Sequence, residues 1–423
     1  MLLISAFKVI HRHKSLIIFF LVIIIGISIN ASPGNTPETE QELKSKIGQM
    51  LLLGFRGTQV YEDSYISKVI KDINIGGVIL FDYDVPSQSF PRNIINPEQT
   101  KKLISGLQAY AKTPLFVAVD AEGGGINRLK EKYGFLKIPS AKEIGNINPK
   151  KAEIIYEKLA GQLAGLGFNL NLAPVVDVNI NPNNPVIGSL QRSFSTDHQT
   201  VTACALAFIN AHKGKGIISA LKHFPGHGSS HHDSHLGLVD VTETYKNYEL
   251  TPYKELIKKG KAEMIMTAHI MNRQVDSDYP ATLSPNFLQK ILRDNLDFKG
   301  VIISDDMQMG AITKNYGFSE AVIRAVNAGC NILAISNNGK SYDEDTVYKA
   351  FKVIINAVKS GKIPMKKIND SYTKILYLKK KFKIIKIQRV QLLLHSLEVP
   401  NSAIGLAKKS NHALTDMLVS IYY

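Results

Sequence analysis

A short segment in the middle of the chain concentrates side chains that can move protons. Residues 220–238 read ALKHFPGHGSSHHDSHLGL and hold five of the chain's 12 histidines. Pro225, Gly226 and Gly228 indicate a shaped loop rather than a helix. Asp233 stands two residues before His235, so a carboxylate can hold one imidazole nitrogen while the other faces a substrate. The same cluster can instead bind a metal ion.

A second candidate group ends an apolar run later in the chain. The segment GVIISDDMQMG places Ser304 and Asp305 directly after a strand-like stretch. At a strand end, the carboxylate of Asp305 is placed to attack an electrophilic carbon, whereas Asp306 would point elsewhere and is interpreted as a structural group. With Asp305 as nucleophile and His235 as proton donor, the pair predicts a double displacement.

Polar residues at other predicted strand ends suit recognition of a polyol. In the segment VAVDAEGGGINRL, Asp120 closes a predicted strand and Arg128 follows in the loop. Asp120 can accept hydrogen bonds from vicinal hydroxyls, and Arg128 and Arg192 can donate to hydroxyl, amide or carboxylate oxygens. Lys222 and His223, at the end of another predicted strand, complete the pocket.

The elements that must position these residues alternate between strand and helix. Continuous apolar runs, rich in Val and Ile, suit strands that are covered on both faces. We predict strands at Ile47–Phe55, Gly76–Phe81, Leu115–Asp120, Phe168–Val178, Gly216–His223, Ala262–Ile270, Gly300–Asp305 and Asn331–Ser336. Helices are predicted between and after them at Asp63–Ile73, Pro97–Ala111, Pro149–Leu166, Asp197–Lys213, Thr244–Lys259, Pro285–Asn295, Ser319–Ala328 and Asp343–Lys359.

Eight strand–helix units predict an α/β fold, a (β/α)8 TIM-type barrel whose strand ends converge at one mouth. A doubly wound open sheet is the rival, but no Gly-rich phosphate fingerprint follows the first strand. The strand ends carry the polar residues Asp82, Asp120, Asp177, Lys222, His223, His269 and Asp305. Such groups are costly at the end of an apolar strand unless they serve a site.

Charge and composition exclude several classes of protein. The net charge is +15, but residues 16–345 carry 33 basic and 33 acidic residues, so the excess lies in the two ends. A neutral body argues against nucleic acid as a partner. With only two cysteines, neither a disulfide scaffold nor a four-cysteine zinc site is expected.

The ends of the chain predict a targeting segment and a tail. Residues 1–31 combine a basic flank with a short apolar run, which predicts a signal peptide or membrane anchor, and hence a periplasmic or extracellular protein that can associate with a membrane through this segment. Residues 32–42 read as a linker, 43–382 as the barrel domain, and 383–423 as a tail that can be a truncated second domain. Lys366–Lys383 is predicted to be a basic helix closing or following the barrel, with a solvated face.

Three motifs together resemble glycoside hydrolase family 3. These are KHFPGHG…DSH at Lys222–His235, SDD at Ser304–Asp306 and DAEGG…R at Asp120–Arg128. The resemblance covers about Leu43–Phe382, and more narrowly it is to the β-N-acetylglucosaminidase (β-hexosaminidase) branch. Two departures stand out: Gly125 replaces an Arg that often follows the double Gly, and the segment ending at Arg192 is longer than usual.

The resemblance implies a role for each candidate residue. Asp305 would be the catalytic nucleophile, His235 the acid/base and Asp233 its dyad partner. The N-acetylglucosamine residue would be bound by Asp120, Arg128, Arg192, Lys222 and His223. Family members need no metal or cofactor, so the resemblance favours the proton-transfer interpretation of the histidine-rich loop.

The expected function is therefore a retaining β-N-acetylhexosaminidase acting on terminal β-linked N-acetylglucosamine, for example in peptidoglycan fragments. A neutral imidazole does not repel phosphate, so phosphorolysis is conceivable, but hydrolysis is favoured for an exported protein. Two alternatives stay open: a metal-dependent barrel hydrolase built on His223, His227, His231 and His235, and a non-catalytic glycan-binding protein.

Overall fold

The computed structural model describes residues 39–385. The predicted targeting segment at 1–31, most of the predicted linker at 32–42 and most of the tail at 383–423 lie outside the described residues. The compact unit that carries the candidate residues begins at Lys44, and the description below concerns that unit. The proposed division of the chain into domains stays a prediction.

Eight parallel strands form the centre of the fold, in the order β11-β9-β7-β6-β3-β2-β1-β12. Their apolar side chains are almost completely buried, as expected for a sheet covered by helices. The strands are β1 (Leu51–Gly54), β2 (Gly77–Ile79), β3 (Phe116–Val119), β6 (Leu170–Asn171), β7 (Ile218–Phe224), β9 (Met264–Thr267), β11 (Val301–Ile303) and β12 (Leu333–Ile335).

The ring of strands is closed between β11 and β12. The amide of Ile332 donates to the carbonyl of Ile302 at 3.1 Å, and the amide of Ser304 donates to the carbonyl of Ile332 at 2.9 Å. Ile303 and Ile332 form a parallel bridge. The predicted (β/α)8 barrel is thereby confirmed, with all eight predicted strands present.

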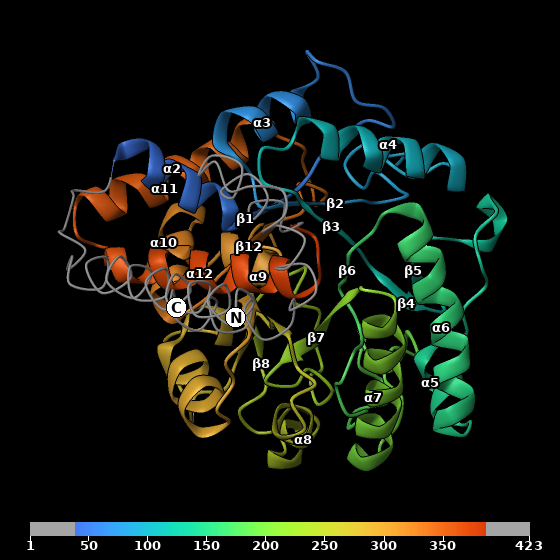
Figure 1. The fold of residues 1–423 in the computed structure, drawn as a ribbon. Helices are drawn as coiled ribbons and strands as arrows, with labels where there is room; N and C mark the ends of the chain where they lie inside the picture. Colours follow the sequence, from blue (N-terminus) through green and yellow to red (C-terminus); the bar gives the residue numbers. More distant parts are fainter. Residues whose placement is uncertain (1–38, 386–423) are drawn as a thin grey trace, which may run out of the picture. The chain divides into compact units, whose positions relative to one another are not determined.

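Helices follow the strands and cover the barrel from outside (Figure 1). Figure 1 shows α6 and α7 side by side next to β6 and β7, and the two helices pack on each other. The helices are α2 (Glu40–Gln49), α3 (Tyr65–Ile73), α4 (Pro97–Tyr110), α5 (Ala141–Gly145), α6 (Pro149–Leu166), α7 (His198–Gly214), α8 (Thr251–Lys258), α9 (Gly310–Thr313), α10 (Phe318–Ala328), α11 (Asp345–Lys359) and α12 (Met365–Lys381). Single-turn helices η1 (Glu131–Tyr133), η2 (Asn247–Leu250) and η3 (Ala281–Leu283) and the π-helix η4 (Asn286–Asn295) complete the set.

Several predicted boundaries are wrong. The first strand was predicted from Ile47, but residues 47–49 end helix α2, since a short buried apolar run does not distinguish the two structures. The helix predicted from Thr244 begins in full only at Thr251, after the short turn η2. The sequence also did not predict the two-stranded additions above the barrel, β4 (Ala121–Gly123) with β5 (Ile126–Asn127), and β8 (Val239–Asp240) with β10 (Ile270–Met271).

Helix α12 is not simply a solvated basic face. Lys379 is completely buried. Its ammonium lies 2.8 Å from Gln49 Oε1, 2.8 Å from the Gly76 carbonyl and 2.7 Å from the Pro114 carbonyl. These acceptors precede β1, β2 and β3, so Lys379 fastens the last described helix to the amino-terminal ends of three strands. Within residues 39–385, none of the helices combines the length and the apolarity that crossing a membrane requires.

Candidate active site

The carboxyl ends of β3 and β7 bring a carboxylate and a lysine into contact. Asp120 directly follows β3, and Lys222 lies within β7. Lys222 Nζ is 2.9 Å from Asp120 Oδ1 and 2.7 Å from Glu122 Oε1, and its side chain is only 3% exposed. Burial alone would lower the pKa of Lys222, but the two carboxylates raise it above its usual value. The lysine is therefore a buried cation held between two acids.

Glu122 also binds Arg192, which joins the β6 loop to the same cluster. Arg192 Nε and Nη2 donate to the two oxygens of Glu122 at 2.8 and 2.7 Å, and Nη1 donates to the Val186 carbonyl at 2.8 Å. Burial alone would raise the pKa of Glu122, but Arg192 and Lys222 hold it well below its usual range. Glu122 was not predicted as a site residue, although it lies inside the DAEGG motif.

A buried carboxylate fixes the orientation of His223. Asp177 Oδ2 lies 2.7 Å from His223 Nδ1, and Asp177 Oδ1 accepts the amides of His223 and His227 at 3.2 and 2.8 Å. His223 Nε2 then lies 3.3 Å from Arg192 Nη2. Asp177 was recognised as a polar strand end but not as a site residue, and the structure makes it the support of a predicted one.

Arg128 approaches the cluster from the β3 loop. Its Nη2 lies 3.9 Å from Asp120 Oδ2, and its guanidinium lies 5.6 Å from the centroid of the Phe81 ring. Within the described part of the chain, the buried Nε of Arg128 has no hydrogen-bond acceptor. The structure therefore brings together all five predicted binding residues, and the side chain of Arg128 is 28% exposed.

A second line of support reaches the cluster from helix α7. Asn171, in β6, donates to the Ala121 carbonyl at 3.0 Å and accepts the Ala121 amide at 3.1 Å, which fixes the backbone between Asp120 and Glu122. His212, which is completely buried, has its Nε2 3.1 Å from Asn171 Nδ2. Burial lowers the pKa of His212 to about 3, so the imidazole is neutral and accepts this bond.

Asp305 occupies the mouth two residues beyond β11. Burial alone would raise its pKa, but His269, His223 and His235 together lower it below the usual value, which favours the ionised form that a nucleophile requires. Its neighbour Asp306 turns away and accepts the amide of Ser336 at 3.0 Å and that of Gln308 at 3.2 Å. This agrees with the structural role predicted for Asp306.

The predicted dyad is formed within the β7 loop. His235 Nδ1 lies 2.6 Å from Asp233 Oδ1, which also accepts the His235 amide at 2.8 Å. The imidazole is 63% exposed. The main-chain carbonyl of His235 accepts the amide of Gly310, five residues beyond Asp305, so the dyad segment lies against the part of the chain that follows Asp305.

The dyad segment is docked on helix α9, which follows Asp305 in the chain. The Gly310 amide donates to the His235 carbonyl and the Ala311 amide to the Ser234 carbonyl, both at 3.2 Å. Lys314 Nζ donates to the Leu236 carbonyl at 2.7 Å. A Cβ at residue 310 would lie 2.7 Å from the His235 carbonyl oxygen, so only glycine permits this approach.

The metal alternative gains no support from the geometry of the histidines. His231 and His232 are exposed, and His223 is held by Asp177. His227 Nδ1 contacts Ser230 Oγ, and its Nε2 lies 3.3 Å from Ser234 Oγ. Among residues 39–385, no three His, Cys, Asp or Glu side chains are grouped as a metal site would need.

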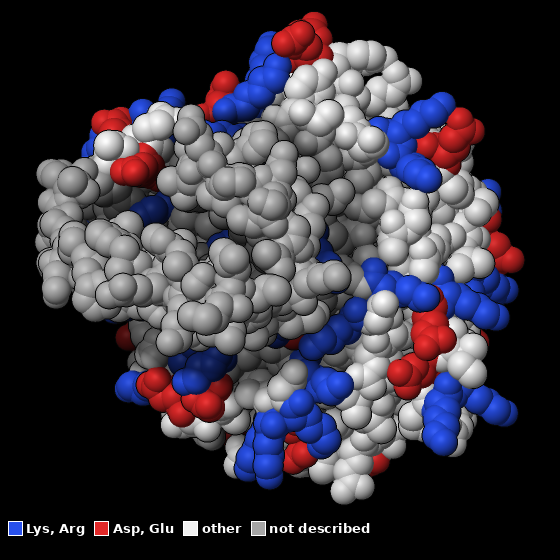
Figure 2. Space-filling model, viewed as in Figure 1, with Lys and Arg blue, Asp and Glu red and all other residues white. Residues whose placement is uncertain are grey.

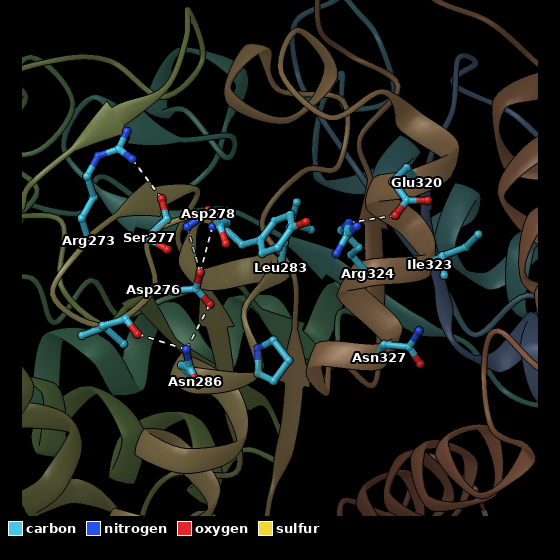
Figure 3. Close-up of a pocket in the computed structure, with 13 residues that line it drawn as sticks. Arg273, Asp276, Ser277, Asp278, Leu283, Asn286, Glu320, Ile323, Arg324 and Asn327 are labelled. Carbon is cyan, nitrogen blue, oxygen red and sulfur yellow. Dashed lines mark hydrogen bonds and ion pairs between the residues drawn. The ribbon is translucent and has the colours of Figure 1, made fainter.

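A cavity of about 650 Å³ lies away from these residues, between the loop after β10 and helix α10 (Figure 3). Several of its charged groups are already partnered: Asp276 accepts Ser284 Oγ at 2.5 Å, and Arg324 pairs with Glu320 at 2.8 Å and covers the ring of Tyr279. None of the predicted site residues lines this cavity.

Comparison with known proteins places the same region in one family. The model of the glycosyl hydrolase family 3 N terminal domain matches residues 42–378. Beta-hexosaminidase A of Pseudoalteromonas piscicida is 32% identical over 390 residues, covering 84% of this chain and 63% of that protein. A beta-hexosaminidase of Tolumonas auensis is 34% identical over 294 residues, covering 68% of this chain and 83% of that protein.

The fold also matches a solved structure. A glycoside hydrolase family 3 beta-N-acetylglucosaminidase from Paenibacillus sp. str. FPU-7 superposes with a TM-score of 0.73 at 32% identity, covering 81% of this chain and 63% of that one. The chain thus spans somewhat less than two thirds of the length of two of these relatives.

Proposed function

Because the chain belongs to glycosyl hydrolase family 3, we propose that it is a retaining β-N-acetylhexosaminidase that removes terminal β-linked N-acetylglucosamine. The observation that supports this most is the docking of the dyad segment on helix α9, where the His235 and Ser234 carbonyls accept the amides of Gly310 and Ala311, five and six residues beyond Asp305. In the proposed double displacement, Asp305 is the nucleophile and His235 the proton donor.

In the first half-reaction, a carboxylate oxygen of Asp305 attacks the anomeric carbon. His235 gives the proton on Nε2 to the glycosidic oxygen as the bond between that oxygen and the anomeric carbon breaks. The products are an ester between the sugar and Asp305, the released alcohol and a neutral imidazole. Asp233, 2.6 Å from Nδ1, holds the proton on that nitrogen and so keeps Nε2 facing the reacting bond.

In the second half-reaction, water replaces the alcohol. The neutral Nε2 of His235 removes a proton from water, whose oxygen attacks the anomeric carbon and displaces the carboxylate of Asp305. The enzyme returns to its starting protonation state. Two inversions at one carbon retain the β configuration.

The buried cluster beside Asp305 would hold the sugar. Asp120 accepts bonds from hydroxyl groups, and Arg128, whose side chain is 28% exposed, donates to hydroxyl or amide oxygens. His223 presents its Nε2 and Lys222 holds Asp120 in place. Arg192 uses most of its donors on Glu122 and Val186, so its contribution is chiefly to keep Glu122 and His223 oriented.

We further propose that the natural substrates are peptidoglycan fragments or related glycans, met outside the cytoplasm after export through the predicted segment at 1–31. An acid/base that is neutral between the two half-reactions does not repel phosphate, so phosphate is a conceivable acceptor in place of water. Hydrolysis is the proposed reaction, because a sugar phosphate has little use to an exported enzyme.

The test is a panel of nitrophenyl glycosides assayed with and without phosphate and chelator. We expect release of nitrophenol from the N-acetyl-β-glucosaminide and not from the plain β-glucoside, unchanged by chelator. Asp305→Ala should abolish turnover, and azide should restore part of it as a glycosyl azide, since azide replaces the missing nucleophile.

Each alternative predicts a different result. Turnover that survives in Asp305→Ala would reject the mechanism, and loss of activity with chelator would favour a metal-dependent hydrolase. Binding of chitooligosaccharides without turnover of any glycoside would indicate a glycan-binding protein. Formation of N-acetylglucosamine phosphate in phosphate buffer would replace hydrolysis by phosphorolysis.

A further inference from the structure

The dyad loop, residues 223–238, has a buried base and a more exposed tip. Residues 223–230 are buried, whereas His231, His232 and His235 are exposed. Two buried carboxylates bind backbone amides of this base: Asp177 accepts those of His223 and His227, and Glu249 accepts that of Gly228. Asp177 also orients the His223 ring, whereas the mechanism gives Glu249 no part.

Glu249 reaches the loop from the single turn η2. Its side chain is completely buried, and its carboxylate accepts the Gly228 amide and the Lys246 amide, each at 3.1 Å. The fit is close, because a Cβ at Gly226, where φ is +135°, would lie 2.8 Å from the Glu249 Cβ. The loop therefore packs so closely on the Glu249 side chain that position 226 has no room for a larger residue.

The surroundings of Glu249 contain no cation that would explain its burial. Within residues 39–385 it forms no ion pair, and the ionisable groups that interact with it are Asp177, Tyr245 and Tyr253. Burial, and then Asp177, raise its pKa to about 7, although the amide of Lys246 opposes the shift. Burying a carboxyl group without a cation is costly. We therefore attribute the position of Glu249 to the backbone amides that it binds.

We propose that Glu249 is a positioning residue for the acid/base: by holding the Gly228 amide, it fixes the base from which Asp233 and His235 extend to helix α9. This inference rests on the proposed function, because it assigns Glu249 a role in delivering the His235 proton. The loop would then be fixed at two ends, by Glu249 below and by the contacts with Gly310, Ala311 and Lys314 above.

The experiment compares Glu249→Gln with Glu255→Gln in the full chain. The first change keeps the size of the side chain but turns one oxygen into a donor, which opposes either the Gly228 or the Lys246 amide. Glu255 lies in the adjacent helix α8, is not buried and pairs with Lys259. Both proteins are assayed with a dinitrophenyl glycoside, whose leaving group needs no acid, and with chitobiose, whose leaving group does.

We expect Glu249→Gln to lower kcat/KM for chitobiose by about 100-fold, the cost of a small misplacement of a catalytic group, and to change the dinitrophenyl rate little. Amide hydrogen exchange over residues 229–238 should become faster. Glu255→Gln should match the wild type in every readout. If Glu249→Gln does not fold, Gly226→Ala displaces the same contact from the loop side and should show the same selective loss, with Gly237→Ala as its control, since a Cβ there meets nothing.

The outcomes separate the two proposals. Equal losses on both substrates, or unchanged exchange over residues 229–238, would overturn the role of Glu249 and leave the enzyme assignment intact. A wild-type protein that turns over neither substrate would reject the proposed function, and the positioning role with it.

Discussion

At the scale of single residues, the site depends on an acid that was not predicted but that pairs with two of the predicted binding residues. Glu122 lies between Arg192 and Lys222, each within 2.8 Å of its oxygens, and the three side chains are nearly buried. Removing one charge from such a group leaves the others uncompensated in a medium of low dielectric constant, which costs more than the original group contributes.

We therefore expect Glu122→Gln to lower the free energy of unfolding by about 3–5 kcal/mol, as found when one partner of a buried pair is removed. The measurement is denaturant unfolding, together with KM, which should rise because Lys222 loses one of its two carboxylates. Glu98→Gln is the control, since Glu98 pairs with Lys102 on the surface. Equal stability of the two variants would contradict this account.

The sequence predicted the residues to which we assign the chemistry, but not Glu122 or the supporting role of Asp177. Asp305 could be recognised because it lies in a short motif at a strand end, and Asp233 and His235 because they lie two residues apart in the histidine-rich loop after β7. Glu122 and Asp177 take their roles from partners that are 70 and 46 residues away in the chain, and no local pattern encodes such a pairing. An acid inside a strand-end motif was the one available signal for Glu122.

At the scale of elements, helix α9 carries the backbone amides on which the dyad segment docks. We expect Gly310→Ala to push the loop away, because the new Cβ would lie 2.7 and 2.9 Å from the His235 and Leu236 carbonyl oxygens. Turnover of substrates with poor leaving groups should fall by about 10- to 100-fold, with little change in stability.

Gly161→Ala is the control. Gly161 lies in helix α6, and a Cβ added there would have no atom within 4 Å apart from the backbone of its own helix. It should leave turnover unchanged and raise the free energy of unfolding by about 0.5–1 kcal/mol. Wild-type kinetics in Gly310→Ala would show that the loop docks elsewhere during turnover.

Helix α7 gives the barrel a dependence on pH. His212 has a folded-state pKa of about 3 because of its burial, whereas an exposed histidine titrates near 6.5. As the pH falls through about 6.5, protons bind the unfolded chain first, so acid removes stability, by about 1.4 kcal/mol per pH unit between the two values.

His212→Gln keeps an acceptor for Asn171 but cannot titrate, so the variant should lack this contribution. The difference in unfolding free energy between wild type and variant should therefore shrink as the pH is lowered from 7 to 5 in denaturant titrations. His232→Gln, at an exposed position, should show no such trend. A difference that does not depend on pH would rule out a neutral, buried His212.

Most of the elements were predictable to within a few residues, but the strand predicted at Phe168–Val178 is reduced to Leu170–Asn171, which is β6. The errors have a common cause: a short buried apolar run does not show whether its residues follow the period of a helix or that of a strand. Residues 47–49 end a helix whose buried face looks apolar over the same short run as the strand that follows. The pairs β4–β5 and β8–β10 contain two or three residues per strand, too few for a pattern.

At the scale of the molecule, acidic side chains lie among the basic ones on the visible surface (Figure 2). This agrees with the balanced charge of residues 16–345. Lys379 differs from the other basic residues near the end of the described chain, because it is buried against the amino-terminal ends of three strands.

We expect Lys379→Met to lower the free energy of unfolding by about 2–4 kcal/mol, because three buried acceptors lose their donor while the volume is kept. Denaturant unfolding measures this, and Lys366→Met on the same helix, whose ammonium is exposed, is the comparison. An undiminished stability in Lys379→Met would mean that helix α12 does not fasten the barrel.

The docking of the dyad loop uses main-chain carbonyls of Ser234, His235 and Leu236. Every residue type has a main-chain carbonyl, so these contacts do not depend on the side chain of Leu236, which is 64% exposed. In the proposed reaction, a substitution at residue 236 would therefore change the preference for the departing part of the glycan without removing the contacts that hold His235.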